Sequence, residues 1–144
     1  SIGTLTRTAW HDSGTFRLPI ASSSNGKVFN HENGVNDVSS AMAASLETGF
    51  FSGDENGDNI IMISRIIPDT TFAAGSSVNF SMLSKRYPND STITKGPFAV
   101  TSSTNKLNLR SRGRSFQCKW ESTALNTSWR LGTWRAEGQA DGTR

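Results

Sequence analysis

The chain of 144 residues has few of the side chains that build covalent, metal-bound or membrane-spanning structures. Its one cysteine, Cys118, excludes a disulfide within the chain and a cysteine-rich zinc site. Contiguous apolar runs such as residues 60–63 are four residues long, whereas a membrane-spanning helix needs about 20 apolar residues. Hydrophobic residues make up only 34% of the chain. These shortages exclude a disulfide scaffold and a helical membrane protein.

Hydroxyl side chains take the place of the missing apolar ones. There are 21 serines and 15 threonines, a quarter of the chain, together with 13 glycines. Threonine and the aromatic residues favour strands, whereas glycine, asparagine, aspartate and serine favour turns. The composition therefore predicts an all-β protein of antiparallel sheets with long loops, built as a sandwich or from propeller-like or β-barrel elements.

Glycines and turn dipeptides divide the chain into short segments. Asn25-Gly26, just before Lys27, is a strong signal for a hairpin turn. We expect one β-rich domain over residues 1–144, with a sub-boundary near residues 50–58. The predicted strands cover residues 4–10, 15–20, 27–31, 40–48, 59–66, 77–86, 98–101, 106–112, 115–121 and 128–137.

Alternation of apolar and polar residues supports several of these strands. In the strand 115–121, Phe116, Cys118 and Trp120 share one face, which is typical of a half-buried antiparallel strand. Pro97 is expected at a strand boundary, where its missing N–H does no harm. The alanines of residues 38–46 also favour a short helix, so a helical turn is an alternative to strand there.

Short motifs that resemble catalytic or metal sites fail on geometry. His11, Asp12 and Ser13 have the side chains of a hydrolase triad, but neighbours on a strand point to opposite faces and do not converge. The acidic segment 54–58 resembles the start of a calcium loop, yet its glycine is fourth and its twelfth position is Arg65. We therefore expect no enzyme, and we predict no catalytic, cofactor-binding or metal-binding residue.

The basic character of the chain is concentrated at its C-terminal end. The formal net charge of +3 divides into +4 over residues 110–144 and about −1 over the residues before them. Arg110, Arg112 and Arg114 stand at alternate positions, so on a strand all three share one face. Such a row can contact nucleic-acid phosphates, pair with carboxylates of a neighbouring subunit, or lie in solvent. The small net charge disfavours the first of these interpretations.

Glycine and tryptophan are interspersed among these arginines. Gly113 marks a bulge or a close backbone contact. Trp129 and Leu131 share one face of a predicted strand and Arg130 lies on the other, which suits a strand with one packed side. The tryptophans are either core residues or interface anchors, and both interpretations stay open.

The order of these motifs resembles the C-terminal end of the tail-tube proteins of short-tailed phages. That family comprises the nozzle, or tail tubular protein B-like, components and the related packaged-DNA stabilisation tail proteins. Arg7-Thr8-Ala9-Trp10, the H-E-N-G at residues 31–34 and Gly96-Pro97 also follow in the order expected of it. The matching C-terminal positions are Arg110, Arg112, Gly113, Arg114, Trp129, Arg130, Leu131, Gly132, Arg135, Asp141, Gly142 and Arg144.

The resemblance implies a structural virion protein of the phage tail, of which this chain would be the C-terminal part. Such proteins form a homo-oligomeric ring, which we expect to be a hexamer, below the portal and adaptor. The ring extends the channel and conducts DNA during ejection. The expected partners are further copies of the chain, the adjacent tail and adaptor proteins, the tail fibres and the viral DNA in transit. No cofactor is expected.

Subunit contacts in such a ring are assigned to the arginine-rich end. The arginine row would pair across the joint with acids such as Asp54, Glu55 or Asp58. The predicted interface or channel residues are Arg110, Arg112, Arg114, Trp129, Arg130, Arg135 and Arg144.

A different class of function competes with the ring. The chain would then be a β-sandwich module that binds carbohydrate or nucleic acid. Trp10, Trp129 and Trp134 would be exposed platforms on which sugar rings or bases stack.

Overall fold

The computed structural model describes residues 7–73 and 75–143 of the chain. Strands account for 54% of it, all in antiparallel sheets, none of which closes into a barrel. The described residues contain no helix, and so none that could cross a membrane. The predicted all-β class is confirmed.

The chain divides into two compact units, Ser1–Gly34 and Val35–Arg144. The predicted sub-boundary near residues 50–58 lies within the second unit. Residues 51 and 52 of that segment pair with residues 116 and 115, so this part of the chain belongs to a sheet of the second unit.

The first unit is a three-stranded antiparallel sheet in the order β1 (Arg7–His11), β2 (Ile20–Ser23) and β3 (Val28–Asn30). The predicted turn at Gly26 connects β2 to β3 with a φ of 77°, which glycine adopts without strain. The predicted strand 15–20 is wrong, because residues 13–18 form bends and the strand begins only after Pro19. Residues 4–6 of another predicted strand lie outside the described residues.

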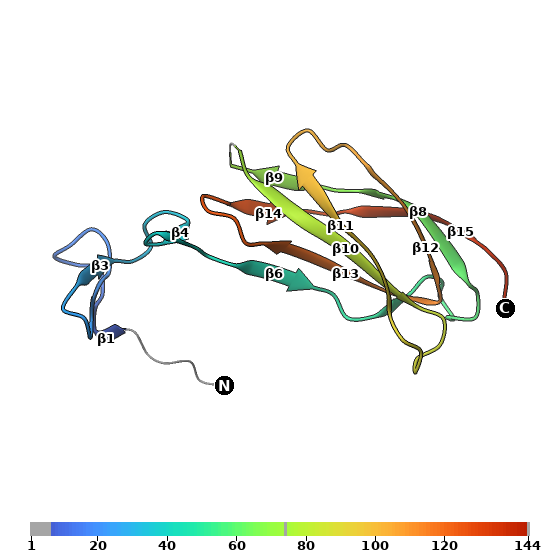
Figure 1. Cartoon of the computed structure of the whole chain (residues 1–144), viewed down its shortest axis with the longest axis horizontal. Helices are drawn as coiled ribbons and strands as arrows, with labels where there is room; N and C mark the ends of the chain where they lie inside the picture. Colours follow the sequence, from blue (N-terminus) through green and yellow to red (C-terminus); the bar gives the residue numbers. More distant parts are fainter. Residues whose placement is uncertain (1–6, 74, 144) are drawn as a thin grey trace. The chain divides into compact units, whose positions relative to one another are not determined.

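The second unit contains two main sheets (Figure 1). The first sheet has the order β11-β10-β13-β6, and β7 also pairs with β13. Its strands are β11 (Ile93–Thr101), β10 (Ser77–Lys85), β13 (Ser115–Ser122), β6 (Ala44–Glu47) and β7 (Phe51–Ser52).

The second sheet has the order β12-β8-β15. Its strands are β12 (Leu107–Gly113), β8 (Ile61–Ile67) and β15 (Arg135–Ala140). Two further pairs join β14 (Trp129–Leu131) to β9 (Thr70–Phe72) and β4 (Asn36–Asp37) to β5 (Ser40–Ala41).

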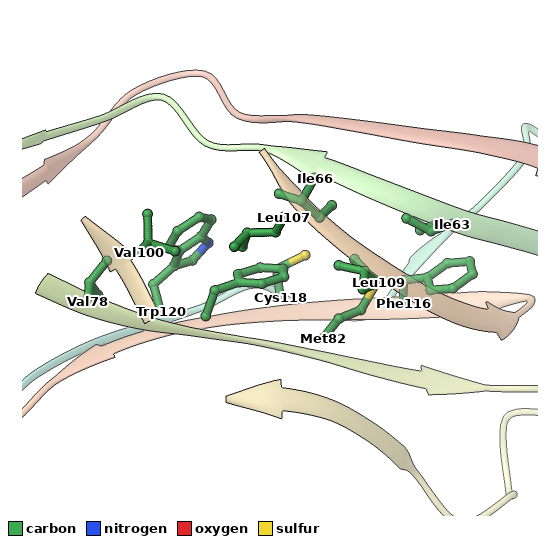
Figure 2. Close-up of a cluster of buried hydrophobic side chains, with 11 residues drawn as sticks. Ile63, Ile66, Val78, Met82, Val100, Leu107, Leu109, Phe116, Cys118 and Trp120 are labelled. Atoms are coloured by element: carbon green, nitrogen blue, oxygen red, sulfur yellow. The ribbon is translucent and has the colours of Figure 1, made fainter. Parts of the chain in front are cut away.

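The core of the second unit lies between its two main sheets. Figure 2 shows Ile63 and Ile66 of β8 and Leu107 of β12 on one side, facing Cys118 and Trp120 of β13 on the other. The remaining buried members are Val78, Phe80, Met82, Val100, Leu109 and Phe116. Residues 116, 118 and 120 are all fully buried, so the predicted alternation of β13 is confirmed. The unit is therefore a β-sandwich.

Three other predicted strands differ from the observed ones. The strand 98–101 belongs to the longer β11, which contains Pro97; β11 is an edge strand, where proline is tolerated. The predicted strand 40–48 is divided into β5 and β6 by a break at residues 42–43, and residues 38–46 form no helix. The strand 128–137 is broken after Leu131, because Asp69 binds the backbone N–H groups of Gly132 and Thr133 at 2.7 and 3.0 Å.

Candidate functional site

The arginine row begins on β12, at one edge of the second sheet. Leu107, Leu109, Ser111 and Gly113 point inward and are buried, whereas the residues between them point away from the core. Arg110 and Arg112 therefore share the outer face of the sheet, as predicted. Arg114 lies one residue beyond the end of β12, in the bend that leads to β13.

Arg112 is bound to the C-terminal segment of its own chain. Its Nε donates a hydrogen bond to Asp141 Oδ2 and forms an ion pair with that carboxylate. A second guanidinium nitrogen donates to the Asp141 carbonyl oxygen at 2.9 Å. Both side chains are about two-thirds covered, with exposed fractions of 35% and 38%. Arginine can make two such bonds at once because its planar fork presents several donors in fixed directions.

Arg114 holds the same C-terminal segment at the next position. Its guanidinium donates to the Thr143 carbonyl oxygen at 2.7 Å and lies 5.1 Å from the ring centroid of Tyr87. Ile60 and residues 141–142 add two backbone hydrogen bonds, each of 2.7 Å. We call this set of contacts the C-terminal clasp: Arg112 and Arg114 on one side, with Ile60, and residues 141–143 on the other.

Gly113 lies between the two clasp arginines and touches the neighbouring backbone closely. A Cβ placed on it would lie 2.8 Å from the Lys85 carbonyl oxygen. The same oxygen accepts the backbone N–H of Arg114 at 2.8 Å. The predicted close backbone contact at Gly113 is confirmed. The spacing R-G-R followed by D-G therefore has a structural explanation within one chain.

Three predicted site arginines remain without a described partner. Arg110, Arg130 and Arg135 are exposed, and among residues 7–73 and 75–143 none of their side chains makes a hydrogen bond or ion pair. Arg144 lies outside the described residues. The guanidinium groups of Arg110, Arg130 and Arg135 are therefore the ones available to another molecule.

Trp129 is anchored in the second unit. It is partly buried, packs against the core, and donates from Nε1 to Ser122 Oγ at 2.9 Å. Leu131 packs against the same core while Arg130 between them is exposed, as the strand pattern predicts. Trp134 is also partly buried, with its ring 6.2 Å from that of Phe51. These contacts favour the core interpretation for both tryptophans.

The acidic segment 54–58 is a structured turn. The Asp54 carboxylate accepts the backbone N–H of Asn59 at 3.1 Å and its side-chain amide at 2.9 Å. Desolvation acts to raise the pKa of Asp54, but these hydrogen bonds outweigh it and the pKa lies below its ordinary value. Among the described residues no three His, Cys, Asp or Glu side chains gather as a metal site would require.

The side chains of His11 and Asp12 form hydrogen bonds with their sequence neighbours. The Asp12 carboxylate accepts the backbone N–H of Ser13 at 2.7 Å, and His11 Nδ1 contacts the Asp12 carbonyl oxygen at 2.6 Å.

Burial of Cys118 raises the pKa of its thiol to about 12, so this sulfur stays protonated at neutral pH and is a poor nucleophile.

One tryptophan is exposed, and it belongs to the first unit. Trp10 is 56% exposed and its ring lies 4.5 Å from that of His31. Beside it is a hollow of about 190 Å³ lined by Ala9, Trp10, His11, Ile20, Ala21, Ser22 and Val28. Of the three tryptophans predicted as stacking platforms, Trp10 alone has a largely exposed ring.

No family model matches the sequence, and neither does any curated protein. The resemblance to phage tail-tube proteins rests on the short motifs given above and stays a prediction. The clasp and the Gly113 contact tie those C-terminal motifs together in space, since Arg112 meets Asp141 and Arg114 meets Thr143.

Replacing Arg112 with methionine is expected to lower the free energy of unfolding by about 1–2 kcal/mol. The change keeps the aliphatic stem and removes two charge-assisted hydrogen bonds to residue 141, one of which is also an ion pair. Arg110→Met is the matched control on the same face of β12, and it should change stability by less than about 0.5 kcal/mol. Urea unfolding of both variants measures the difference, and equal losses would contradict the clasp.

Proposed function

We propose that this chain is a structural subunit of a phage tail tube or nozzle ring that extends the portal–adaptor channel and conducts DNA during ejection. The observation that carries the proposal is the outer surface of the second sheet. Both of its edge strands, β12 and β15, carry an exposed arginine without a described partner, Arg110 and Arg135. Side chains placed in this way can pair with a neighbouring subunit.

The C-terminal motifs support the same function. They follow the order found at the C-terminal end of the tail-tube family, and the clasp brings them together. In the proposed ring, expected to be a hexamer within the virion tail, the working partners are further copies of the chain, adjacent tail and adaptor proteins, tail fibres and DNA in transit. A wall along which DNA slides is better served by arginines engaged with protein than by arginines free to bind phosphates.

A second candidate function is a β-sandwich module that binds carbohydrate or nucleic acid. The exposed ring of Trp10 and the hollow beside it favour this alternative, because sugar rings and bases stack on exposed aromatic faces. The partly buried Trp129 and Trp134 weaken it, because their rings are occupied by the core.

Light scattering on the full chain, with concentration and salt varied, separates the two functions. A ring subunit should show a mass that rises with concentration toward a multiple of 15.6 kDa. A single-chain mass at all concentrations would contradict the ring. A binding module should stay a monomer, and its tryptophan fluorescence should respond to an oligosaccharide or an oligonucleotide, with oligonucleotide affinity falling steeply as salt increases.

A further inference from the structure

The edge strands of the two main sheets differ in how well they are protected against pairing with another chain. Proteins protect such edges with lysine, proline or very short strands. In the first sheet, β11 carries Lys95 and Pro97, and the opposite edge is formed by strands of four and two residues, β6 and β7. This sheet is therefore poorly suited to strand addition.

The edge strands of the second sheet have seven and six residues, and one register irregularity interrupts the pairing of each with β8. Neither β12 nor β15 contains lysine or proline, and each pairs on one side only, with β8. All six residues of β15 are exposed. A hollow of about 260 Å³ opens beside it, lined by Phe51, Ser52, Gly53, Ile61, Ile63, Ala136, Gly138, Gln139 and Ala140. A strand placed next to β15 would cover this hollow.

Charge on the outer face distinguishes the two edges. The strand β12 carries Arg110 and Arg112 and no acid, and Arg110 has no described partner. The strand β15 carries both Arg135 and Glu137 and so has no net charge; the Glu137 side chain is 46% exposed although it pairs with Arg65 at 2.7 Å. Opposite charges on adjacent strands attract, and like charges repel. An edge β12 of one copy therefore suits an edge β15 of another better than it suits a second β12.

The strand directions permit this contact. Both β12 and β15 are antiparallel to β8, so they run parallel to each other. Asn108 of β12 and Glu137 of β15 both pair with Arg65, and just beyond this position the register of each strand with β8 is irregular. A second copy shifted sideways along the sheet would thus bring its Arg110 close to Glu137. When this contact is repeated, both edges of every copy are used and the copies associate head to tail.

We propose that copies of this chain associate by parallel pairing of β15 of one copy with β12 of the next, so that their second sheets join into one continuous sheet. The proposal rests on the proposed ring and specifies its joint. A contact between two β15 strands, in contrast, would stop at two copies and leave both β12 edges unpaired.

Cross-linking tests the joint directly. The variant Asn108→Cys/Gln139→Cys, treated with a short bismaleimide, should give a ladder of covalent multimers on a denaturing gel. Gln139→Cys alone should stay monomeric, and so should Lys95→Cys/Gln139→Cys, which places one thiol on the protected edge β11. The unmodified chain is a further control, because its Cys118 is fully buried. Dimers from Gln139→Cys alone would overturn the proposal in favour of β15–β15 pairing.

A charge reversal provides an independent measurement. Arg110→Glu should weaken self-association by about three- to tenfold, because an attraction to Glu137 becomes a repulsion. Lys95→Glu makes the same change of charge on β11 and should leave association unchanged. Equal effects of Arg110→Glu and Lys95→Glu on self-association would overturn the β15–β12 joint. A multimer whose Asn108→Cys/Gln139→Cys variant gives no cross-linked ladder would overturn it as well. The proposed ring would survive either result. A chain that is monomeric at every concentration would instead contradict the ring itself.

Discussion

Replacing Gly113 with alanine is expected to destabilise the protein by about 3 kcal/mol, although it adds one methyl group. The new Cβ would lie 2.8 Å from the Lys85 carbonyl oxygen and 3.1 Å from Ser84 Cβ. Ser84 is 1% exposed, and the Lys85 oxygen accepts the N–H of Arg114, so neither can move without loss. The strand β12 must then shift away from β10, and this movement disturbs the clasp arginines on either side.

Gly49→Ala is the matched control for this prediction. A Cβ at Gly49 has no neighbour within 4 Å, and the residue does not have a positive φ. Its replacement should change the free energy of unfolding by less than about 0.5 kcal/mol. Urea unfolding gives both values. A Gly113→Ala variant as stable as Gly49→Ala would show that the close contact with Lys85 does not constrain β12.

Strands whose alternation is local were predictable from the sequence. The predicted strands 77–86, 106–112 and 115–121 agree with β10, β12 and β13 to within one residue at each end. In each case one face is buried against the opposite sheet, so the pattern of side chains directly reports the packing. The core residues of β13 could be named for the same reason.

Features that depend on distant partners could not be predicted in this way. The break after Leu131 comes from Asp69, which is more than 60 residues away in the sequence. The partner of Arg112 is Asp141, 29 residues further along the chain, and only the pairing of both β12 and β15 with β8 brings them together. The shared face of Arg110 and Arg112 was predictable from the alternation, whereas Arg114 lies in the bend before β13. No local signal in the sequence marks these contacts.

Replacing Trp120 with alanine is expected to cost about 3–5 kcal/mol, a large part of the stability of a typical domain. The side chain is fully buried, and its ring lies 4.6 Å from that of Phe80. It lies between the two sheets, so its loss leaves a cavity where they meet (Figure 2). Urea unfolding followed by circular dichroism measures the loss. Leu125→Ala, at a position that is 53% exposed, should cost less than about 0.5 kcal/mol.

Trp120→Phe separates the packing of this residue from its polar atom. The indole Nε1 of Trp120 is buried and has no hydrogen-bond partner among the described residues. An unpaired buried donor costs about 1–3 kcal/mol, so removing it offsets part of the cavity that the smaller ring leaves. We expect a net loss of about 1 kcal/mol, well below that of the alanine variant. A phenylalanine variant as unstable as the alanine variant would mean that the indole N–H contributes to stability and that a further contact satisfies it.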